Sequence, residues 1–565
     1  MSENQITGSE ALMRSLINEG VDTIFGYPGG QIMPAFDALY DYKEQLHHVL
    51  VRHEQGAAHA AQGYARVSGR TGVVLITSGP AATNAITGIA DAMIDSTPIV
   101  VITGQVATPL LGTDAFQETD VVGITQPITK WAYQIRSAEQ IAQVVAHAFY
   151  IASTGRPGPV VLDFTRNAQV GKVDYQPQKV THIRSYIPVP DPEPNAIAEA
   201  ARIINEAKKP LALVGQGVII GNAENELLAF LRKADIPAGS TILGLSALSS
   251  DDPLNVGMLG MHGNIAPNLK TNECDVLIAI GMRFDDRVTG DLNTYAKQAK
   301  IIHFDIDHAE IDKNVKTTVA VLGDAKETLP AVTRLLKENR HTEWRDSFKP
   351  LYEKEMDKVI RVELYPDEGP IKMGEVVNKV AEATGNDAII VTDVGQNQMM
   401  GARYSKFKQT RSMVTSGGLG TMGFGLPAAI GAKFGAPDRT VCLFVGDGGL
   451  QMTVQELGTM MQSGISVKII LLNNSFLGMV RQWQELFWRE RYSETPMQNP
   501  DFIKIAEAYR IPGRRVTDRK DLDGAIEEML KTPSAYLLEV EVEQKGMVYP
   551  MIPAGSSVTN IMLGG

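Results

Sequence analysis

Two apolar stretches decide the fold, TVCLFVGDGG (Thr440–Gly449) and VKIILLNN (Val467–Asn474). Each begins as a β-branched run and ends in glycine or polar residues, and a helical pattern with Leu457 and Met460 on one side lies between them. Buried strands that alternate with helices are typical of parallel sheets covered on both faces. Because such a connection is right-handed, both strands of this βαβ unit end at the same edge of the sheet.

The same alternation runs through the whole chain. Strands are predicted at Val21–Phe25, His48–Val51, Gly72–Thr77, Pro98–Thr103, Leu211–Val214, Asp275–Ile280, Lys300–Phe304, Ala388–Thr392, Thr440–Val445 and Val467–Leu472. Helical patterns such as GAAHAAQGYARV (Gly56–Val67) lie between them. The fold class is therefore α/β, with doubly wound parallel sheets whose ligands sit beyond the carboxyl ends of the strands.

Length and composition indicate three domains joined by two connecting segments. A chain of 565 residues exceeds one ordinary core, since domains hold about 100–200 residues each. Five of the 29 prolines fall between Pro177 and Pro194, which is typical of an extended tether. In residues 337–368, 16 of 32 are charged against 21% overall, which favours a solvated helical face or linker. The predicted domains are 1–176, 190–345 and 366–565.

The charge balance excludes some classes of partner. Lys and Arg number 53 and Asp and Glu 65, a formal charge of −12, so neither nucleic acid nor an anionic membrane surface is expected as a partner. No apolar run approaches the ~18 residues that span a bilayer. The first ten residues, MSENQITGSE, show no signal peptide, and two cysteines, Cys274 and Cys442, make no disulfide framework. A soluble protein of a reducing compartment, the cytoplasm, is expected.

Polar side chains follow the two strands quoted first. Asp447 lies directly after one strand and Asn474 after the next, so both are expected at one sheet edge. A carboxylate, an amide oxygen and nearby carbonyls suit a hard divalent ion that keeps further ligands from phosphate. The glycines allow backbone N–H groups to approach phosphate oxygens. The alternative is a tight strand–helix turn followed by an Asn-rich turn, but the second strand at this spacing favours the metal and phosphate.

The GDG pattern followed by NN resembles the diphosphate and Mg²⁺ signature of thiamine-diphosphate-dependent enzymes. This resemblance implies that Asp447, Asn474 and the backbone carbonyl of Phe476 hold Mg²⁺. It further implies contacts to thiamine diphosphate from Pro28, Gln396, Asn397, Gly420, Met422, Gly446, Gly448, Gly449 and Met479, with Asn397 standing where histidine is common. In the family the Gly420 carbonyl accepts from the 4′-amino group and Met422 bends the cofactor, although a methionine alone is more often a packing residue.

Glu54 is the candidate for proton transfer. It lies just past a predicted strand at the start of an Ala-rich helix. A carboxylate beside the aminopyrimidine N1′ favours the imino tautomer, which removes the thiazolium C2 proton. The alternative is an acidic residue stabilised at a helix N-terminus, but RHEQGAAHAAQGYAR (Arg52–Arg66) resembles the family's catalytic-glutamate block. Because Glu54 and Asp447 fall in different predicted domains, the resemblance implies a homodimer or homotetramer with active sites at the subunit interface.

Further blocks resemble one branch of these enzymes, the catalytic subunits of the acetohydroxyacid synthase (acetolactate synthase) family. They are YPGG (27–30), TSGPAATN (77–84), ITGQV (102–106), GTDAFQE (112–118), TGRPGPV (154–160), GMHG (260–263), GMRFDDRVTG (281–290) and GMVRQWQELF (478–487). The resemblance implies decarboxylation of pyruvate and transfer of its two-carbon unit to a second 2-oxo acid. Pyruvate as acceptor gives 2-acetolactate and 2-oxobutyrate gives 2-aceto-2-hydroxybutyrate, in valine, leucine and isoleucine biosynthesis. A small regulatory subunit is also implied.

The resemblance also implies FAD, bound without net redox work. Its contacts fall on Arg156, Gly215, Gly217, Met261, His262, Arg283, Asp285, Arg287, Asp305 and Asp324. Read alone, GQGVIIG (215–221) is a weak dinucleotide fingerprint. The arginines of the RFDDR block could equally form a surface pair with Asp285 and Asp286.

Substrate contacts are implied by position in the same blocks. Trp483 and Phe487 are four apart and share one helix face, where a core aromatic pair is the alternative. In the family the tryptophan narrows the pocket and favours 2-oxobutyrate. Met479 and Val480 complete the predicted pocket; Phe116 and Gln117 are expected near the reacting carbons and Gly30 near the oxyanion.

Some residues depart from the family pattern, and other functions stay open. Gln31, Ala81, Ala107, Arg166 and Asn167 are such departures, and those around the entry channel leave inhibitor sensitivity open. A flavin oxidoreductase of the pyruvate oxidase type, a flavin-free catabolic acetolactate synthase and a silent nucleotide-binding regulator are the alternative functions.

Overall fold

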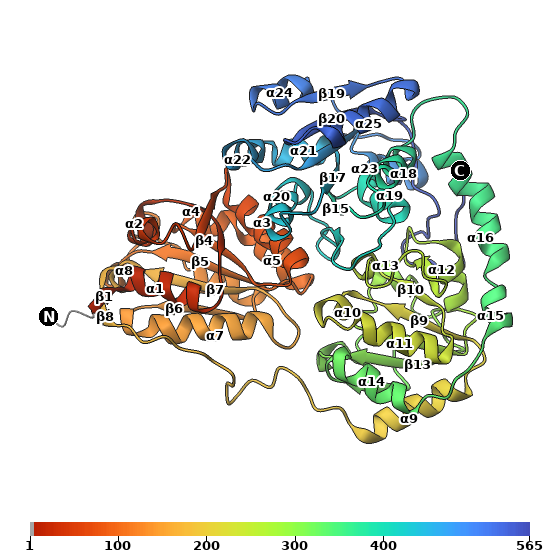
Figure 1. Ribbon diagram of the computed structural model, residues 1–565, viewed down its shortest axis with the longest axis horizontal. Coiled ribbons are helices and arrows are strands. Elements are labelled where there is room, and N and C mark those ends of the chain that lie inside the picture. The colour runs from red at the N-terminus through yellow and green to blue at the C-terminus, as the bar shows by residue number, and fades with distance from the viewer. Residues whose placement is uncertain (1–4, 565) are drawn as a thin grey trace.

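The computed structural model describes residues 5–564, which form three α/β units around a common junction (Figure 1). Each unit is built on a six-stranded sheet whose neighbouring strands all run parallel. A separate two-stranded sheet pairs β1 (Gln5–Thr7) with β8 (Lys172–Asp174) antiparallel, and so joins the two ends of the first unit. The predicted α/β fold class with parallel sheets is confirmed.

The N-terminal sheet has the order β3-β2-β4-β5-β7-β6. Its strands are β2 (Thr23–Tyr27), β3 (His47–Leu50), β4 (Gly72–Ile76), β5 (Ile99–Gln105), β6 (Trp131–Ile135) and β7 (Val160–Thr165). Their nearly continuous burial explains why the predicted strands read as unbroken apolar runs rather than as alternating patterns.

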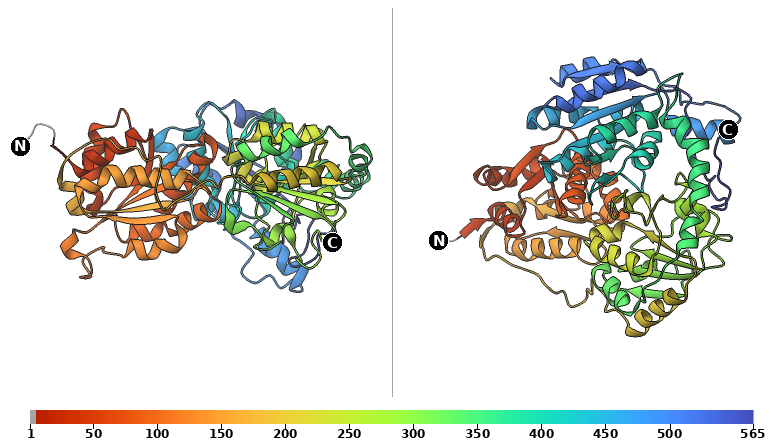
Figure 2. Two further views of the ribbon diagram at one scale, coloured as in Figure 1. Left: turned by 90° about the horizontal axis from the view of Figure 1, so that it is seen from below. Right: turned by 45° about the vertical axis from the view of Figure 1, so that its right-hand side comes forward.

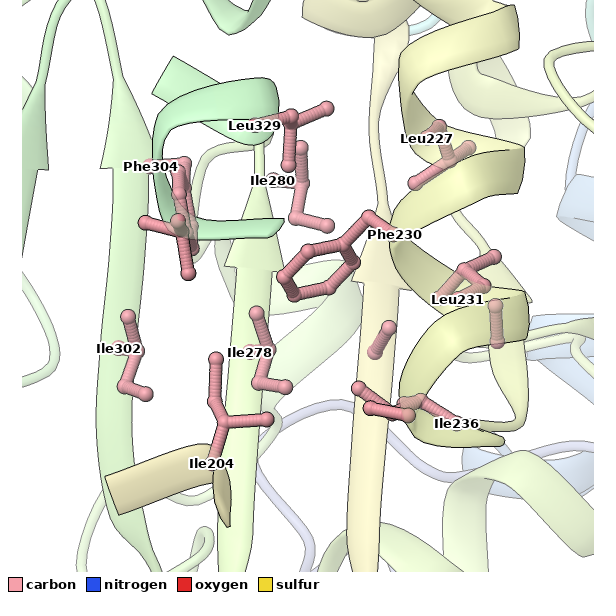
Figure 3. Packing of buried hydrophobic residues seen from close by; sticks show 14 of the residues in the cluster. Ile204, Leu227, Phe230, Leu231, Ile236, Ile278, Ile280, Ile302, Phe304 and Leu329 are labelled. Atoms are coloured by element: carbon pink, nitrogen blue, oxygen red, sulfur yellow. The ribbon is translucent and has the colours of Figure 1, made fainter. Parts of the chain in front are cut away.

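The central sheet has the order β11-β10-β9-β12-β13-β14. Its strands are β9 (Pro210–Val214), β10 (Ala238–Ser240), β11 (Asn255–Met258), β12 (Val276–Ile280), β13 (Lys300–Asp305) and β14 (Val319–Leu322). Figure 3 shows how helices cover one face of it: Phe230 of α11 (Glu224–Ala234) packs beside Ile278 and Ile280. Its ring lies 6.0 Å from that of Phe304, edge to face. Burying each such side chain contributes about 1.5–3 kcal/mol.

The C-terminal sheet has the order β16-β15-β17-β18-β20-β19. Its strands are β15 (Ile389–Thr392), β16 (Met413–Val414), β17 (Val441–Gly446), β18 (Lys468–Asn473), β19 (Gly513–Val516) and β20 (Tyr536–Glu541). All ten strands predicted from sequence are present, with ends shifted by up to two residues. The strands that were missed include β10 and β16, which have three and two residues and so carry little periodic signal.

The helix predicted between β17 and β18 is present at Leu457 and Met460, but the segment that follows the GDGG turn is not one continuous helix. α21 (Asp447–Met452) ends just before Thr453, a 3₁₀ turn follows at Val454–Glu456, and α22 (Leu457–Ser463) comes next. The Thr453 hydroxyl donates to the Gly423 carbonyl at 3.1 Å, so this residue bonds outside its own helix. Beyond the break, a carboxylate oxygen of Glu456 accepts from the backbone N–H of Arg52 in the N-terminal unit at 3.1 Å.

The two connecting segments differ in character. Residues 175–193 contain no helix or strand and cross from the N-terminal unit to the central one, as Figure 2 also shows. The charged segment is helical, with α15 (Thr342–Asp346), α16 (Lys349–Glu355) and α17 (Arg361–Leu364). It is not wholly solvated, since Trp344 and Phe348 are buried and Glu355 forms a buried ion pair with Arg403 at 2.7 Å.

The N-terminal and C-terminal units of one chain are joined by two helices whose backbones are in direct contact at glycine residues. α3 (Glu54–Ser68) packs against α20 (Gly425–Gly435). A Cβ added at Gly63 would lie 2.0 Å from the Ala428 carbonyl oxygen, and one at Gly431 would lie 1.8 Å from that of Ala60. Only glycine permits this approach, so the pair fixes one unit on the other. Among the described residues, no helix has both the length and the apolar character needed to cross a membrane.

The carboxylate of Asp163 lies inside the N-terminal unit. Asp163 of β7 is fully buried and accepts from Thr103 Oγ1 at 2.9 Å, Gln134 Nε2 at 2.9 Å and Gln105 Nε2 at 3.1 Å. Burial raises the pKa of Asp163 to about 6, and the hydrogen bonds only partly oppose it. In the unfolded chain the pKa of this carboxyl is near 4.

The raised pKa of Asp163 sets a pH dependence of stability. Its contribution is fully present below about pH 4 and is lost as the pH rises through about 6, by up to about 3 kcal/mol. We expect the wild type to lose thermal stability relative to Asp163→Asn between pH 4.5 and 7.5, measured as the unfolding midpoint by circular dichroism. A wild-type-minus-variant difference that stays constant over this range would contradict the raised pKa.

Candidate active site

The ends of β17 and β18 bring the predicted metal ligands together. The strands are neighbours and parallel, with Gly446 opposite Leu472. Asp447 begins α21 directly after β17, and Asn474 follows β18. The side chain of Asn499 bridges the two strand ends: its Nδ2 donates to Asp447 Oδ2 at 2.6 Å and to Asn473 Oδ1 at 3.0 Å. Asn499 lies in a loop without a recognisable motif, so it could not be identified from the sequence.

Asn474 is oriented by a chain of buried amides. Its Nδ2 donates to Gln396 Oε1 at 3.2 Å, and Gln396 Nε2 in turn donates to Gln482 Oε1 at 3.0 Å. The Oε1 of Gln482 also accepts from the backbone N–H of Val548 at 2.9 Å. Because the NH₂ group of Asn474 is engaged, its oxygen faces away from Gln396. Gln482 falls inside the GMVRQWQELF block but was not singled out there.

The donor set suits magnesium. Burial raises the pKa of Asp447 to about 6, and the hydrogen bond from Asn499 opposes this. The described residues hold no group of three or more His, Cys, Asp or Glu that could bind a metal. One carboxylate with neutral oxygens matches Mg²⁺, which is usually bound by one or two carboxylates together with substrate phosphates. The residues present therefore fit a magnesium–diphosphate group.

The glycines around this edge keep side chains out of it. A Cβ at Gly448 would lie 2.7 Å from the Leu477 side chain, and one at Gly449 would lie 2.4 Å from Asp393 Oδ1. Asn397, on α19 (Gln396–Tyr404), is buried and donates through Nδ2 to the Phe444 carbonyl at 3.0 Å. It therefore lies beside the end of β17 and near Gly446.

A cavity of about 1100 Å³ opens where the three units meet. It collects most of the residues predicted for the flavin, for the pyrimidine end of thiamine diphosphate and for the substrate pocket. Its lining includes Arg156, Gly217, Met261, His262, Arg283, Asp285, Arg287, Asp305, Asp324, Gly420, Met422, Met479, Val480 and Trp483. Two predicted residues lie beside it: Gly215 closes the turn after β9, and Phe487 is exposed with its ring 5.4 Å from that of Trp483.

The part of the cavity that is lined by the residues predicted for the flavin is polar on one side. Arg156 reaches from the N-terminal unit to Asp307 at 3.1 Å and Glu310 at 2.8 Å. Burial lowers the pKa of His262 to about 4, so the ring is neutral at pH 7, and within the described residues its buried Nδ1 has no partner. Arg287 forms an ion pair with Asp286 at 3.2 Å, and both side chains are exposed. The surface ion pair that the sequence left open as an alternative is therefore present for Arg287. An unpartnered buried nitrogen beside a cavity of this volume fits a dinucleotide.

The remaining predicted residues lie elsewhere on the chain. Glu54 starts α3, half-buried, and its Oε2 accepts from Asn84 Nδ2 at 2.9 Å. Pro28 and Gly30 are exposed, and Phe116 is 83% exposed next to Gln117, whose φ is +63°. None of Glu54, Pro28, Gly30, Phe116 and Gln117 lines the cavity. Within one chain, the structure does not bring these five residues to the cavity residues.

Comparisons with known proteins agree with this division into parts. Residues 393–540 match the family model for the C-terminal TPP binding domain of thiamine pyrophosphate enzymes. Residues 197–332 match the central domain and residues 6–124 the N-terminal TPP binding domain of the same enzymes. The fold and the strand-end site therefore define a thiamine pyrophosphate enzyme.

Full-length relatives narrow the class. Acetolactate synthase isozyme 2 large subunit of Escherichia coli K12 is 43% identical, over 99% of this chain and 99% of its own. A probable acetolactate synthase large subunit of Methanocaldococcus jannaschii is 45% identical, over 98% of this chain and 95% of its own. The acetolactate synthase large subunit of Lactococcus lactis is 44% identical over the same shares. The chain belongs to the acetolactate synthase large-subunit family.

The amide chain behind Asn474 can be tested by Gln482→Leu. Leucine leaves Gln396 Nε2 and the Val548 N–H without this acceptor, at a cost of about 1–3 kcal/mol for each buried donor left unpaired. We expect Mg²⁺-dependent binding of thiamine diphosphate, measured by calorimetry, to weaken about tenfold because Asn474 loses its orientation.

Gln169→Leu is the matched control for this change. Gln169 is equally buried and donates to the carbonyls of Gln31 and Phe164, in the N-terminal unit. It should lower the unfolding midpoint without the loss of cofactor affinity. Equal affinity losses in the two variants would show that Gln482 acts only through general stability.

Proposed function

We propose that this protein is the catalytic subunit of an acetolactate synthase. It decarboxylates pyruvate and transfers the two-carbon unit to a second pyruvate, giving 2-acetolactate, or to 2-oxobutyrate, giving 2-aceto-2-hydroxybutyrate. This reaction leads to valine, leucine and isoleucine. The observation that carries the proposal is the 43–45% identity to acetolactate synthase large subunits over nearly the whole chain.

The residue roles follow from the geometry and the family resemblance. When bound, thiamine diphosphate would supply a nucleophilic C2 atom for the carbonyl of a 2-oxo acid and a thiazolium ring that can accept the electron pair when CO₂ leaves. Asp447, Asn474 and the Phe476 carbonyl would hold Mg²⁺, and through it the diphosphate. Glu54, held by Asn84, keeps a proton at the aminopyrimidine N1′. The Gly420 carbonyl accepts from the 4′-amino group, and Met422 supports the bent cofactor from the cavity wall.

A homodimer or homotetramer completes the site. Glu54, Gly30, Phe116 and Gln117 lie outside their own chain's cavity, so a second copy must supply them if they act on the cofactor held there. The exposure of a large apolar side chain such as Phe116 supports burial of this face in an assembly. Gly30 is also exposed, and its carbonyl accepts from Arg166 at 2.9 Å.

FAD and a small subunit complete the proposed holoenzyme. The cavity volume, the unpartnered Nδ1 of His262 and the facing arginines support FAD, which is held without net redox work. The relatives are called large subunits, which supports a separate small regulatory subunit for this protein. We also propose residues 1–176, 190–345 and 366–565 as the pyrimidine-binding, FAD-binding and diphosphate-binding domains, since each contains one complete six-stranded sheet.

The proposed reaction is tested by incubating the protein with pyruvate and measuring acetoin after acidification. Product should require thiamine diphosphate and Mg²⁺. Glu54→Gln should bind the cofactor within about twofold but slow exchange of its C2 proton, followed by NMR, by about 10²–10⁴-fold. Bleaching of the flavin by pyruvate with formation of acetyl phosphate would instead identify a pyruvate oxidase.

Glu10→Gln is the control that distinguishes proton transfer by Glu54 from the general effect of a carboxylate at a helix N-terminus. Glu10 also lies in the first turn of a helix, α1 (Gly8–Asn18), where it forms a capping box with Thr7. Its replacement should lower stability slightly and leave the exchange rate at the wild-type value. An unchanged exchange rate in Glu54→Gln would remove Glu54 from proton transfer.

Trp483→Leu tests the choice of acceptor. The tryptophan lines the cavity, so the smaller side chain widens the pocket. We expect the preference for 2-oxobutyrate over pyruvate to fall about tenfold or more when both compete, measured as the ratio of the two products. Trp488→Leu is the control, because Trp488 is exposed and outside the cavity lining. A constant product ratio in Trp483→Leu would contradict the assignment.

A further inference from the structure

The loop Ser416–Met422 of the C-terminal unit lies where the three units meet. It carries Gly420 and Met422 into the cavity. A Cβ at Gly417 would lie 2.7 Å from the side chain of Leu243 in the central unit. One at Gly418 would lie 2.9 Å from Asp95 Oδ1 in the N-terminal unit. The loop is therefore enclosed by two other units, and its shape depends on what they present to it.

Asp95 holds one end of this loop. It follows α5 (Ile86–Ile94) and is fully buried. Its Oδ2 accepts from the backbone N–H of Gly417 at 2.8 Å and from Arg66 Nη2 at 2.9 Å. Its Oδ1 accepts from the backbone N–H of Gly418 at 2.7 Å. A carboxylate that receives two consecutive backbone N–H groups and an arginine fixes the loop with charge-assisted hydrogen bonds.

Asp91, one helical turn earlier, holds the other end. Its Oδ1 accepts from Ser416 Oγ and from Thr421 Oγ1, the latter at 3.0 Å. The Ser416 hydroxyl also accepts from the backbone N–H of Thr421 at 2.9 Å, which closes the loop on itself. Both bonded residues flank the backbone that leads to Gly420, and Asp91 is fully buried. Both aspartates are distant from Glu54 in the sequence, and the sequence alone did not identify either of them.

We propose that Asp91 and Asp95 are positioning residues for the pyrimidine end of thiamine diphosphate in their own chain. They set the Ser416–Met422 loop so that the Gly420 carbonyl and Met422 meet the cofactor. This inference rests on the proposed function, and it gives each N-terminal unit two tasks. Glu54 serves the partner's cofactor, whereas Asp91 and Asp95 serve the cofactor of the chain to which they belong.

A simple packing role is the alternative, since buried carboxylates that join units also support stability. The two roles differ in which part of the cofactor they affect. The diphosphate is held at the ends of β17 and β18, whereas the hydrogen bonds of the two aspartates to the C-terminal unit go to the loop at the pyrimidine end. Loss of positioning therefore weakens thiamine diphosphate but spares inorganic diphosphate, and loss of packing affects both ligands.

The first test compares these two ligands in Asp95→Asn by calorimetry with Mg²⁺ present. The asparagine amide places N–H groups against the Gly417 or Gly418 N–H. We expect the Kd for thiamine diphosphate to rise about tenfold, about 1.4 kcal/mol, with the Kd for inorganic diphosphate within about twofold of wild type. Ser416→Ala, a milder change, should shift the same ratio in the same direction and keeps the test decisive if Asp95→Asn folds poorly.

Asp235→Asn is the matched control. Asp235 is also a buried aspartate that receives one arginine, Arg345 at 2.7 Å, and one backbone N–H, that of His341 at 2.8 Å. It lies in the central unit, away from the loop. It should lower stability and leave the ratio of the two Kd values unchanged. Equal changes for both ligands in Asp95→Asn, or no change for either, would overturn the proposal.

The second test uses hybrid dimers. Chains carrying Glu54→Gln and chains carrying Asp95→Asn are co-expressed with different tags, and the hybrid is purified. One of its two sites then contains both changes, and the other contains neither. At a thiamine diphosphate concentration that leaves the Asp95→Asn homodimer largely inactive, the hybrid should regain about half of the wild-type specific activity.

The outcomes separate this inference from the proposed function. If the hybrid is no more active than the two homodimers, Glu54 and Asp95 of one chain act on the same cofactor. This result would overturn the proposal that they act on the cofactors of different chains. A wild-type protein that binds no thiamine diphosphate would instead refute the proposed function. A wild-type protein that binds and turns over normally, beside an Asp95→Asn variant with an unchanged Kd ratio, would refute only the positioning role.

Discussion

The parallel pairing of β17 with β18 is the constraint on which the site depends. Because both strands end at one edge, Asp447 and Asn474, which are 27 positions apart in the sequence, lie on adjacent strand ends. A hairpin between the same two segments would place the two residues at opposite ends of the pair. The bridging Asn499 and the amide chain through Gln396 and Gln482 add orientation to a proximity that the sheet already provides.

The contact between α3 and α20 determines which parts of the N-terminal unit reach the cavity of their own chain. Since the backbones touch at Gly63 and Gly431, the N-terminal unit has one fixed place on the C-terminal unit. In that place α5 reaches the Ser416–Met422 loop, but Glu54, at the start of α3, stays outside the cavity. The same helix thus ties the units of one chain together and presents its first residue to the outside.

Much of the fold and part of the site could be predicted from the sequence. The strands were found because buried parallel strands are unbroken apolar runs, and Asp447 and Asn474 because they follow such runs directly. Short strands such as β16 have too few residues to show a period. Asn499, Asp91 and Asp95 could not be found, because each acts through a contact distant in sequence and belongs to no local motif. The roles of Glu54 and Phe116 rest on the family resemblance, since one chain does not bring them to the cofactor residues.

The break at Thr453 also limits how the chain can vary in length. On one side of it, Asp447 is held by the end of β17 and by Asn499. On the other side, Glu456 is held by the backbone of Arg52, and Thr453 itself by Gly423. Because its two ends are bonded to different units, the segment from Asp447 to Glu456 cannot change its length without moving one of them. An inserted or deleted residue there would have to displace either Asp447, the proposed metal ligand, or the helix that begins with Glu54, so natural relatives should keep this spacing even where the side chains differ.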